Sequence, residues 1–244
     1  MDESKFTVPF RTQALRFVLR PVFRLLFHLL SSIRIFGKEN IPAHGAYLIA
    51  INHISLFEPP FIMAFWPTAP EGAGAVDIWD RAGQSTLVRL YGGIPVHRGQ
   101  FDRSSITRLL AALKSGRPLL IAPEGGRSHS LGMMRGLPGA AYLAENAQVS
   151  IVPVGIIGTS DDFLSQALKG HRGSLEMYIG KPFTLPPTVG RGESRSAARQ
   201  ANTDLIMRKI AELLPSEYHG VYRYEADSNL VEENETEKGS PKDG

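Results

Sequence analysis

The sequence predicts an α/β fold: a mixed central sheet flanked by helices, preceded by an amphipathic helix pair at the amino terminus. Short apolar runs alternate with helical periodicity from residue 33 to residue 214, which is typical of α/β layers. The length of 244 residues and the apolar content of 43% are ordinary for one globular domain. We therefore expect helices over residues 1–32, one folded domain over residues 33–222 and an acidic disordered tail over residues 223–244.

The elements follow one another with recognisable boundaries. Apolar runs predict strands at residues 33–36, 47–51, 94–96, 118–122, 150–157 and 174–179. Helical periodicity predicts helices at residues 81–90, 104–114, 137–146 and 194–214, and a short helix at 61–66 that begins at the Pro59-Pro60 pair. Asp102 is placed to cap the helix that Gly116 ends. Residues 37–45, 67–74 and 158–173 are expected to be loops or irregular.

The amino-terminal segment combines large apolar side chains with a cationic stripe. Eleven apolar side chains lie between residues 15 and 30, and a basic residue recurs at every fourth position: Arg16, Arg20, Arg24 and His28. Spanning a bilayer is near break-even, because the apolar residues gain roughly 3–7 kcal/mol and two central arginines cost about 5–7 kcal/mol. We expect an interfacial helix pair, broken at Pro21, whose arginines reach headgroup phosphates. The alternative is a helix docked on the protein's own core with a solvated arginine face.

Charge and composition narrow the class of partner. The net charge is +3, but from Arg223 onward three basic and seven acidic side chains give −4, so residues 1–222 carry +7. A basic body favours an anionic partner, and nucleic acid is poorly supported because the basic residues adjoin long aliphatics. The chain has no cysteine, which excludes disulfides and thiolate metal sites. Its start, Met1-Asp2-Glu3, is acidic, whereas a secretory signal peptide begins with basic residues. We expect a peripheral protein on the cytoplasmic face of the membrane.

One candidate site begins directly after the predicted strand at residues 47–51. His53 follows this apolar run, and Glu58 lies five positions later, immediately before the two prolines. A loop over residues 53–57 can fold the Glu58 carboxylate back onto the imidazole, which leaves the opposite ring nitrogen free to take a proton. The alternative is a structural histidine at a strand end with an unrelated surface glutamate.

A second candidate loop follows the predicted strand at residues 118–122. Glu124, Gly125, Gly126 and Arg127 place a carboxylate, two glycines and a guanidinium in one turn, which suits an anion such as phosphate. An ordinary strand-to-helix turn is the alternative. Arg98 is a further candidate phosphate ligand, although an arginine in its position is often only a surface residue. The seven histidines show no His-Glu-x-x-His spacing, so we expect no metal and no cofactor.

These motifs, taken in order, resemble one family. The sequence NHISLFE at residues 52–58, GGIPVHR at 92–98, PEGGRS at 123–128 and IVPV at 151–154 is similar to the glycerophospholipid acyltransferases, whose best-known members are 1-acylglycerol-3-phosphate acyltransferases. The resemblance covers residues 33–183 and implies transfer of a fatty acyl group from acyl-CoA or acyl carrier protein to a lysophospholipid. The expected acceptor is 1-acylglycerol-3-phosphate, and the product is phosphatidic acid.

The resemblance also implies roles for individual residues. His53 would deprotonate the acceptor hydroxyl, and Glu58 would stand in the place of the family's aspartate, giving His-x4-Glu where His-x4-Asp is usual. Arg98 and Arg127 would hold the acceptor phosphate, and Glu124 in its glycine turn would help place the glycerol. Gly126 stands where threonine is frequent and Ala122 where phenylalanine is frequent, which affects the identity of the acceptor more than the type of reaction.

Two other classes of function remain open from the residues. A serine hydrolase acting on lipids would use Ser55 or Ser128 as nucleophile, but the chain contains no Gly-x-Ser-x-Gly elbow. A lipid-binding module with a decayed site would bind a membrane surface without consuming a thioester.

Overall fold

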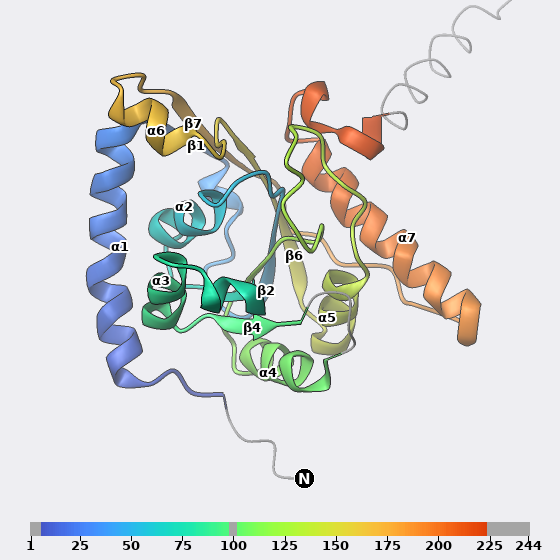
Figure 1. Cartoon of the computed structure of the whole chain (residues 1–244). Coiled ribbons are helices and arrows are strands. Elements are labelled where there is room, and N and C mark those ends of the chain that lie inside the picture. Colours follow the sequence, from blue (N-terminus) through green and yellow to red (C-terminus); the bar gives the residue numbers. More distant parts are fainter. Residues whose placement is uncertain (1–5, 98–101, 224–244) are drawn as a thin grey trace, which may run out of the picture.

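The central sheet has seven strands. The structure, a computed structural model, describes residues 6–97 and 102–223. The strands pair in the order β1-β7-β6-β2-β5-β3-β4 (Figure 1). Neighbouring strands are parallel except β6 and β7, so the predicted mixed sheet is confirmed. The bounds are β1 (Ser32–Phe36), β2 (Tyr47–Ile51), β3 (Glu71–Ala75), β4 (Ile94–Val96), β5 (Leu119–Ile121), β6 (Ser150–Ile157) and β7 (Ser174–Ile179).

Helices cover both faces of the sheet. One face carries α1 (Phe10–Leu30), α2 (Glu58–Phe65), α3 (Gln84–Tyr91) and α6 (Phe163–Leu168), and the other carries α4 (Arg103–Lys114), α5 (Gly139–Ala147) and α7 (Gly192–Ala211) (Figure 1). Short 3-10 turns lie at Lys38–Asn40, Val76–Asp80, Ser216–Tyr218 and Gly220–Tyr222. Each layer buries its own apolar cluster, built around Phe61 and Trp66 on the first face and around Ile206 and Ile210 on the second.

Most of the predicted elements are present. The strands expected at residues 47–51, 94–96, 150–157 and 174–179 have the predicted bounds, and the expected helices differ at their ends by a few residues. Asp102 caps α4 as predicted, because its side chain accepts hydrogen bonds from the backbone N–H groups of Ser104 and Ser105. Helix α6 was not predicted and lies in the stretch expected to be irregular.

The prediction of a loop over residues 67–74 is wrong for its second half. Strand β3 has the sequence Glu-Gly-Ala-Gly-Ala, without the branched or aromatic residues that favour strands, yet it lies between β5 and β4. Its glycines pack closely against side chains: a Cβ on Gly72 would lie 2.4 Å from Cε at the flexible end of Met63, and one on Gly74 would lie 3.2 Å from the Trp79 ring. The strand is therefore specified by its neighbours in the fold.

The predicted break at Pro21 is also wrong. Helix α1 is one continuous helix of 21 residues with Pro21 inside it, where a helix pair was expected. A proline in a helix interior costs roughly 3 kcal/mol, since it removes one backbone hydrogen bond. Side chains on both sides of the proline are tied to the body of the protein: Arg20 donates to the carbonyl of Met63, and Arg24 donates to the carbonyl of Ala64. These tertiary contacts offset the missing bond.

The arginine stripe of α1 faces the protein, contrary to both sequence interpretations. Arg16 is 2% exposed and forms a bidentate ion pair with Glu71 of β3, at 2.8 and 2.7 Å. Arg20 and Arg24 donate to carbonyls at the carboxyl end of α2, where cations are favoured. The fourfold spacing predicted a shared face correctly, but the partners that bury this face come from residues 63–71, which the spacing cannot reveal.

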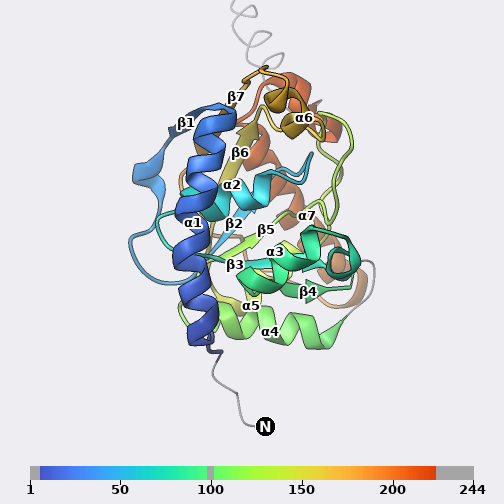
Figure 2. The same ribbon diagram turned by 60° about the vertical axis from the view of Figure 1, so that its left-hand side comes forward.

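The outward face of α1 is apolar instead. Figure 2 shows α1 lying across the outside of α2. Phe17 is 81% exposed and Leu25 is 60% exposed, and the same surface includes Phe10, Leu15, Val18, Val22, Leu26 and Leu29. We call these eight side chains the α1 apolar face. Among the described residues, no helix has the length and apolar character needed to cross a bilayer.

Candidate functional site

The first site loop is fixed at the carboxyl end of β2. The Asn52 side chain, which is fully buried, donates to the carbonyl of Ile156 at 3.0 Å and accepts from the N–H of the same residue at 2.8 Å. It thereby extends the pairing of β2 with β6 by one more position. The chain then leaves the sheet as an irregular segment over residues 52–57 and enters α2 at Glu58. His53 therefore projects from the edge of the sheet where sites of parallel α/β folds lie.

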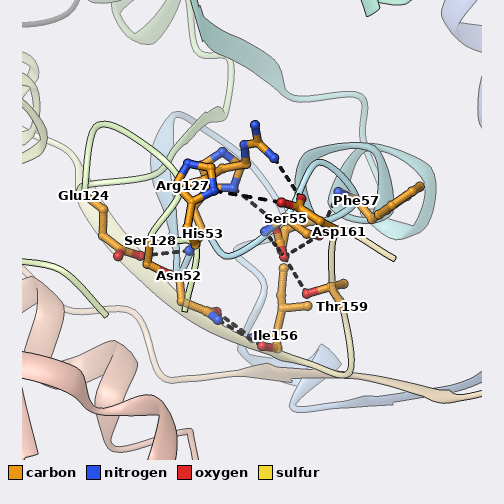
Figure 3. Close-up of polar contacts among 12 residues, drawn as sticks. Asn52, His53, Ser55, Phe57, Glu124, Arg127, Ser128, Ile156, Thr159 and Asp161 are labelled. Carbon is orange, nitrogen blue, oxygen red and sulfur yellow. Dashed lines mark hydrogen bonds and ion pairs between the residues drawn. The ribbon is translucent and has the colours of Figure 1, made fainter. Parts of the chain in front are cut away.

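The Glu58 carboxylate meets the imidazole as the sequence predicted. His53 Nδ1 lies 3.0 Å from Glu58 Oε2, and the Nδ1–H donates to the carboxylate (Figure 3). Glu58 is fully buried as the first residue of α2, whereas the His53 side chain is 14% exposed. Because Nδ1 is occupied, Nε2 is the ring nitrogen left to exchange a proton with a substrate.

Two further residues hold the Glu58 carboxylate. The Ser55 N–H donates to both carboxylate oxygens, at 2.9 and 3.0 Å, and the Ser55 hydroxyl donates to Oε1 at 2.9 Å. The Thr159 hydroxyl, just beyond β6, also donates to Oε1. The carboxylate is thus fixed from two separate parts of the chain, and its orientation in turn fixes the imidazole. Sequence analysis considered Ser55 as an alternative nucleophile and missed Thr159, which follows a strand and a glycine without any motif of its own.

The second site loop packs directly against the first. Glu124 Oε1 accepts the backbone N–H of His53 at 2.8 Å, and the N–H of Ser128 donates to the carbonyl of His53 at 2.9 Å. Figure 3 shows the two loops converging, with the His53 imidazole and the Arg127 side chain on the same side of them. The motifs at residues 52–58 and 123–128 therefore form one site.

The glycine turn is shaped by its neighbours. Gly125 has φ +70, a left-handed conformation that other residues rarely adopt, and a Cβ at this position would lie 2.4 Å from Leu137 Cδ1. Glu124, expected to help place the glycerol, is buried and accepts the N–H of Met134 at 2.7 Å through its second oxygen. Both of its oxygens therefore bind backbone N–H groups, and the bond from His53 makes Glu124 one of two connections between the loops.

Burial gives Glu124 an unusual pKa. Desolvation raises the pKa of this carboxyl from 4.5 to about 7, against the opposing hydrogen bonds from Met134 and His53. The folded protein therefore keeps a proton between pH 4.5 and about 7 that the unfolded chain releases. The associated stabilisation is present below pH 4.5 and is lost as the pH rises through about 7, by about 3 kcal/mol at 1.36 kcal/mol per pH unit.

We predict that this dependence is visible in unfolding experiments. The free energy of unfolding should fall between pH 5 and pH 8 in the wild type, and Glu124→Gln, which has no proton to release, should lack this part of the slope. Urea unfolding of both proteins at the two pH values measures the difference. Equal slopes would show that Glu124 does not titrate in this range.

Arg127 is already paired in the structure. Its Nη1 donates to Asp161 Oδ1 at 2.8 Å, and its side chain is 17% exposed against 52% for Asp161. Sequence analysis did not single out Asp161, which lies in the stretch after β6 that was expected to be irregular. Arg98, the other predicted phosphate ligand, lies outside the described residues. Gly126 lies in the loop between Glu124 and Arg127 with its predicted role untested.

The serine hydroxyls proposed as alternative nucleophiles are engaged elsewhere. Ser55 is fully buried, donates to Glu58 and accepts the N–H of Phe57. The Ser128 hydroxyl donates to the carbonyl of Ser130. Neither hydroxyl gives its proton to a histidine, which a serine nucleophile requires. In the described part of the chain, no group of three or more histidine, aspartate or glutamate side chains could hold a metal ion.

Comparison with known proteins shows the family to which the chain belongs. The family model described as Acyltransferase matches residues 32–157, more than half of the chain, and includes both site loops. The chain belongs to this acyltransferase family. The resemblance noted from the motifs is thereby confirmed, whereas Thr159 and Asp161 lie just beyond the matched region.

Three relatives of this acyltransferase are named as acyltransferases that act on lipids. It is 30% identical over 152 residues to a 1-acyl-sn-glycerol-3-phosphate acyltransferase of Helicobacter pylori, covering 57% of this chain and 60% of that protein. It is 30% identical over 186 residues to a lyso-ornithine lipid O-acyltransferase of Pseudomonas aeruginosa, and the match covers 68% of this chain and 69% of that protein. The 1-acyl-sn-glycerol-3-phosphate acyltransferase of Bacillus subtilis is 23% identical over 192 residues, and the match covers 78% of this chain and 92% of that protein.

A solved structure shows the same fold. The 1-acyl-sn-glycerophosphate acyltransferase of Thermotoga maritima superposes on this acyltransferase with a TM-score of 0.59 and 21% sequence identity, over 86% of this chain and 85% of that one. This likeness supports the α/β architecture and its central mixed sheet.

Proposed function

We propose that this acyltransferase moves a fatty acyl group from an acyl thioester to the free hydroxyl of 1-acylglycerol-3-phosphate, giving phosphatidic acid. The observation that carries the proposal is the His53–Glu58 pair held against the loop at residues 124–128. Two relatives are named for that acceptor. Either acyl-CoA or acyl carrier protein supplies the same thioester.

The reaction follows from the ring nitrogen that Glu58 leaves open. His53 Nε2 takes the proton of the acceptor hydroxyl while the hydroxyl oxygen attacks the thioester carbonyl carbon. The carbon–sulfur bond then breaks, and the leaving thiolate takes the proton back from the imidazolium. Glu58 holds the imidazole in the tautomer with a proton on Nδ1 and stabilises the imidazolium when it forms. No covalent intermediate with the protein is needed.

Recognition of the acceptor headgroup involves Arg127 together with Arg98. A phosphate that approaches Arg127 competes with Asp161 for the guanidinium, or shares it. This ion pair favours a second candidate acceptor, lyso-ornithine lipid, whose headgroup carries both a carboxylate and an ammonium. Such a headgroup could place its carboxylate at Arg127 and its ammonium at Asp161. The relative from Pseudomonas aeruginosa is named for that acceptor.

The two acceptors predict opposite effects of Asp161→Asn. For lysophosphatidic acid, removing the competing carboxylate should lower KM several-fold. For lyso-ornithine lipid, removing the partner of the ammonium should raise KM several-fold. In both cases the size of the change follows from about 1 kcal/mol of binding free energy for one exposed ion pair. Thiol release from palmitoyl-CoA with each acceptor measures both effects, and Asp162→Asn, next along the chain and also exposed, is the matched control. If no acceptor causes thiol release, the catalytic proposal fails and a lipid-binding module is favoured.

We also propose that the protein lies on the cytoplasmic face of a membrane through the α1 apolar face. Eight large apolar side chains of this helix lie exposed, while Arg16, Arg20 and Arg24 donate hydrogen bonds to the body of the protein. Transfer of such a surface from water to the membrane interface gains about 25 cal/mol per Å². The acceptor and the product both reside in the bilayer, so this position gives the site its substrate without complete extraction of the lipid.

A further inference from the structure

A basic cavity lies at the amino ends of the central strands, whereas the acyltransferase site lies at their carboxyl ends. Its volume is about 620 Å³, and its lining comes from α1, from the connection between β1 and β2, and from the residues just before β3 and β5. The site loops follow the carboxyl ends of β2 and β5, whereas the cavity lies at their amino ends, where it is lined by Tyr47, the first residue of β2, and by Pro118, just before β5. A five-residue strand separates the two edges by about 16 Å. The cavity is therefore distinct from the acceptor site.

Positive charge predominates in this cavity. Its lining includes Arg16, Arg20, Lys38 and Arg117, with His44 beside them, and among the described residues that line it none is acidic. Glu71 lies behind the lining and neutralises one charge, since it pairs with both Arg16 and Arg117. The four cations therefore exceed the single carboxylate by three.

Arg20 shows that this excess is not compensated locally. Its guanidinium donates to the carbonyls of Met63, Trp66 and Pro67, which are dipoles and not charges. Burial lowers the pKa of Arg20 and the nearby charges of Arg24 and Arg16 lower it further, against an opposing effect of Tyr91. Half-buried cations without a matching number of carboxylates are stabilised when an anion binds between them.

The rim of the cavity joins the α1 apolar face. Phe17 lines the cavity and is also one of the most exposed side chains of that face. Figure 2 shows the β1–β2 connection running beside α1, where it forms the other wall. If the apolar face rests in a bilayer, the cavity opens at the flank of the helix, at the depth of lipid headgroups.

We propose that this cavity binds the phosphate headgroup of an anionic membrane phospholipid, whose acyl chains lie along the α1 apolar face. The proposal rests on the proposed contact of α1 with the membrane and is independent of the acyl transfer. Arginine suits phosphate because its planar fork matches two phosphate oxygens, and lysine adds a point charge at the rim. The bound lipid would hold the enzyme on anionic bilayers while the acceptor site stays free for turnover.

Vesicle binding by the full chain tests the proposal. Cosedimentation is measured with phosphatidylcholine vesicles and with vesicles in which a minor fraction is replaced by phosphatidylglycerol. Lys38→Gln should reduce the gain from phosphatidylglycerol about fivefold, since each basic residue near an anionic surface contributes about that factor. Lys209→Gln on α7, a lysine on the other face of the sheet whose side chain is 39% exposed, should leave the gain unchanged. Equal losses in both variants would overturn the proposal.

A second variant separates a cavity from a general positive field. Ala43→Trp fills the cavity from its exposed wall without a change in charge and should abolish most of the gain. If it binds phosphatidylglycerol vesicles like the wild type, the attraction comes from net charge and the cavity is not the site. Thr68→Trp, which narrows the cavity from its exposed rim and also leaves the charge unchanged, replaces it if the Ala43 variant does not fold.

Two more arms identify the ligand and isolate the proposal from catalysis. Inorganic phosphate at the concentration of the lipid headgroups should not displace the protein from vesicles, and displacement would indicate a site for free phosphate. His53→Ala should bind both kinds of vesicle like the wild type, because the cavity does not include the catalytic loops. If the wild type binds neither kind of vesicle, the α1 membrane contact is contradicted and the headgroup site falls with it, whereas the proposed acyl transfer is unaffected.

Discussion

Replacing His53 with alanine is expected to lower kcat/KM for acyl transfer by about 100- to 10,000-fold, the usual contribution of a general base. The fold should survive, because the contacts of His53 with the second loop are made by its backbone: its N–H donates to Glu124 and its carbonyl accepts from Ser128. Alanine retains both groups. Thiol release and phospholipid product are measured together at saturating acyl-CoA.

The control for this variant is another histidine. His171 is exposed and lies outside both site loops, so His171→Ala should keep wild-type turnover. Circular dichroism and thermal unfolding of the His53 variant check that its structure is retained. Turnover within tenfold of the wild type in a folded His53→Ala protein would remove the imidazole from the mechanism.

Glu58→Gln is expected to lower kcat by about 100-fold or more and to destabilise the protein. The carboxylate is surrounded by donors: the His53 Nδ1–H, the Ser55 N–H and the hydroxyls of Ser55 and Thr159. A glutamine places its NH₂ group against at least one of these donors, which leaves a buried donor unsatisfied at a cost of about 1–3 kcal/mol. It also favours the wrong imidazole tautomer, as an amide does in the serine-protease triad.

Glu58→Asp is the matched comparison for the glutamine variant. Aspartate keeps the acceptor character and loses one methylene, so it should retain more activity than glutamine although its carboxylate is drawn back toward α2. kcat, KM and the free energy of unfolding are measured for both. If glutamine is as active as aspartate, the negative charge at this position is not needed.

The catalytic loops were the part of the fold most readable from the sequence. His53 and Glu124 each follow an apolar run that forms a central strand, and parallel strands bring such positions to one edge. The distance from His53 to Glu58 also predicted a loop, because two prolines fix where α2 can begin. Both inferences use only residues that are close in the sequence, and in these two loops such residues determine the structure.

Other features depend on partners far away in the chain. Strand β3 contains two glycines and a buried glutamate; it pairs with β5 and β4, and Glu71 forms an ion pair with Arg16 of α1. Thr159 and Asp161 carry no motif and reach the site only because β6 ends beside β2. The direction of the arginine stripe likewise depends on Glu71 and the end of α2. The periodicity of a single segment cannot reveal partners that lie far away in the sequence.

The most direct test of the account is the protonation of His53 itself. Nitrogen-15 NMR of histidine-labelled protein, with His53→Ala used to assign the signal, distinguishes the ring nitrogen that carries hydrogen from the one that does not. At a pH where the ring is neutral, the account predicts hydrogen on Nδ1, bonded to Glu58, and a bare Nε2. Hydrogen on Nε2 with a bare Nδ1 would contradict it, since the proposed base would then have no free electron pair facing the substrate.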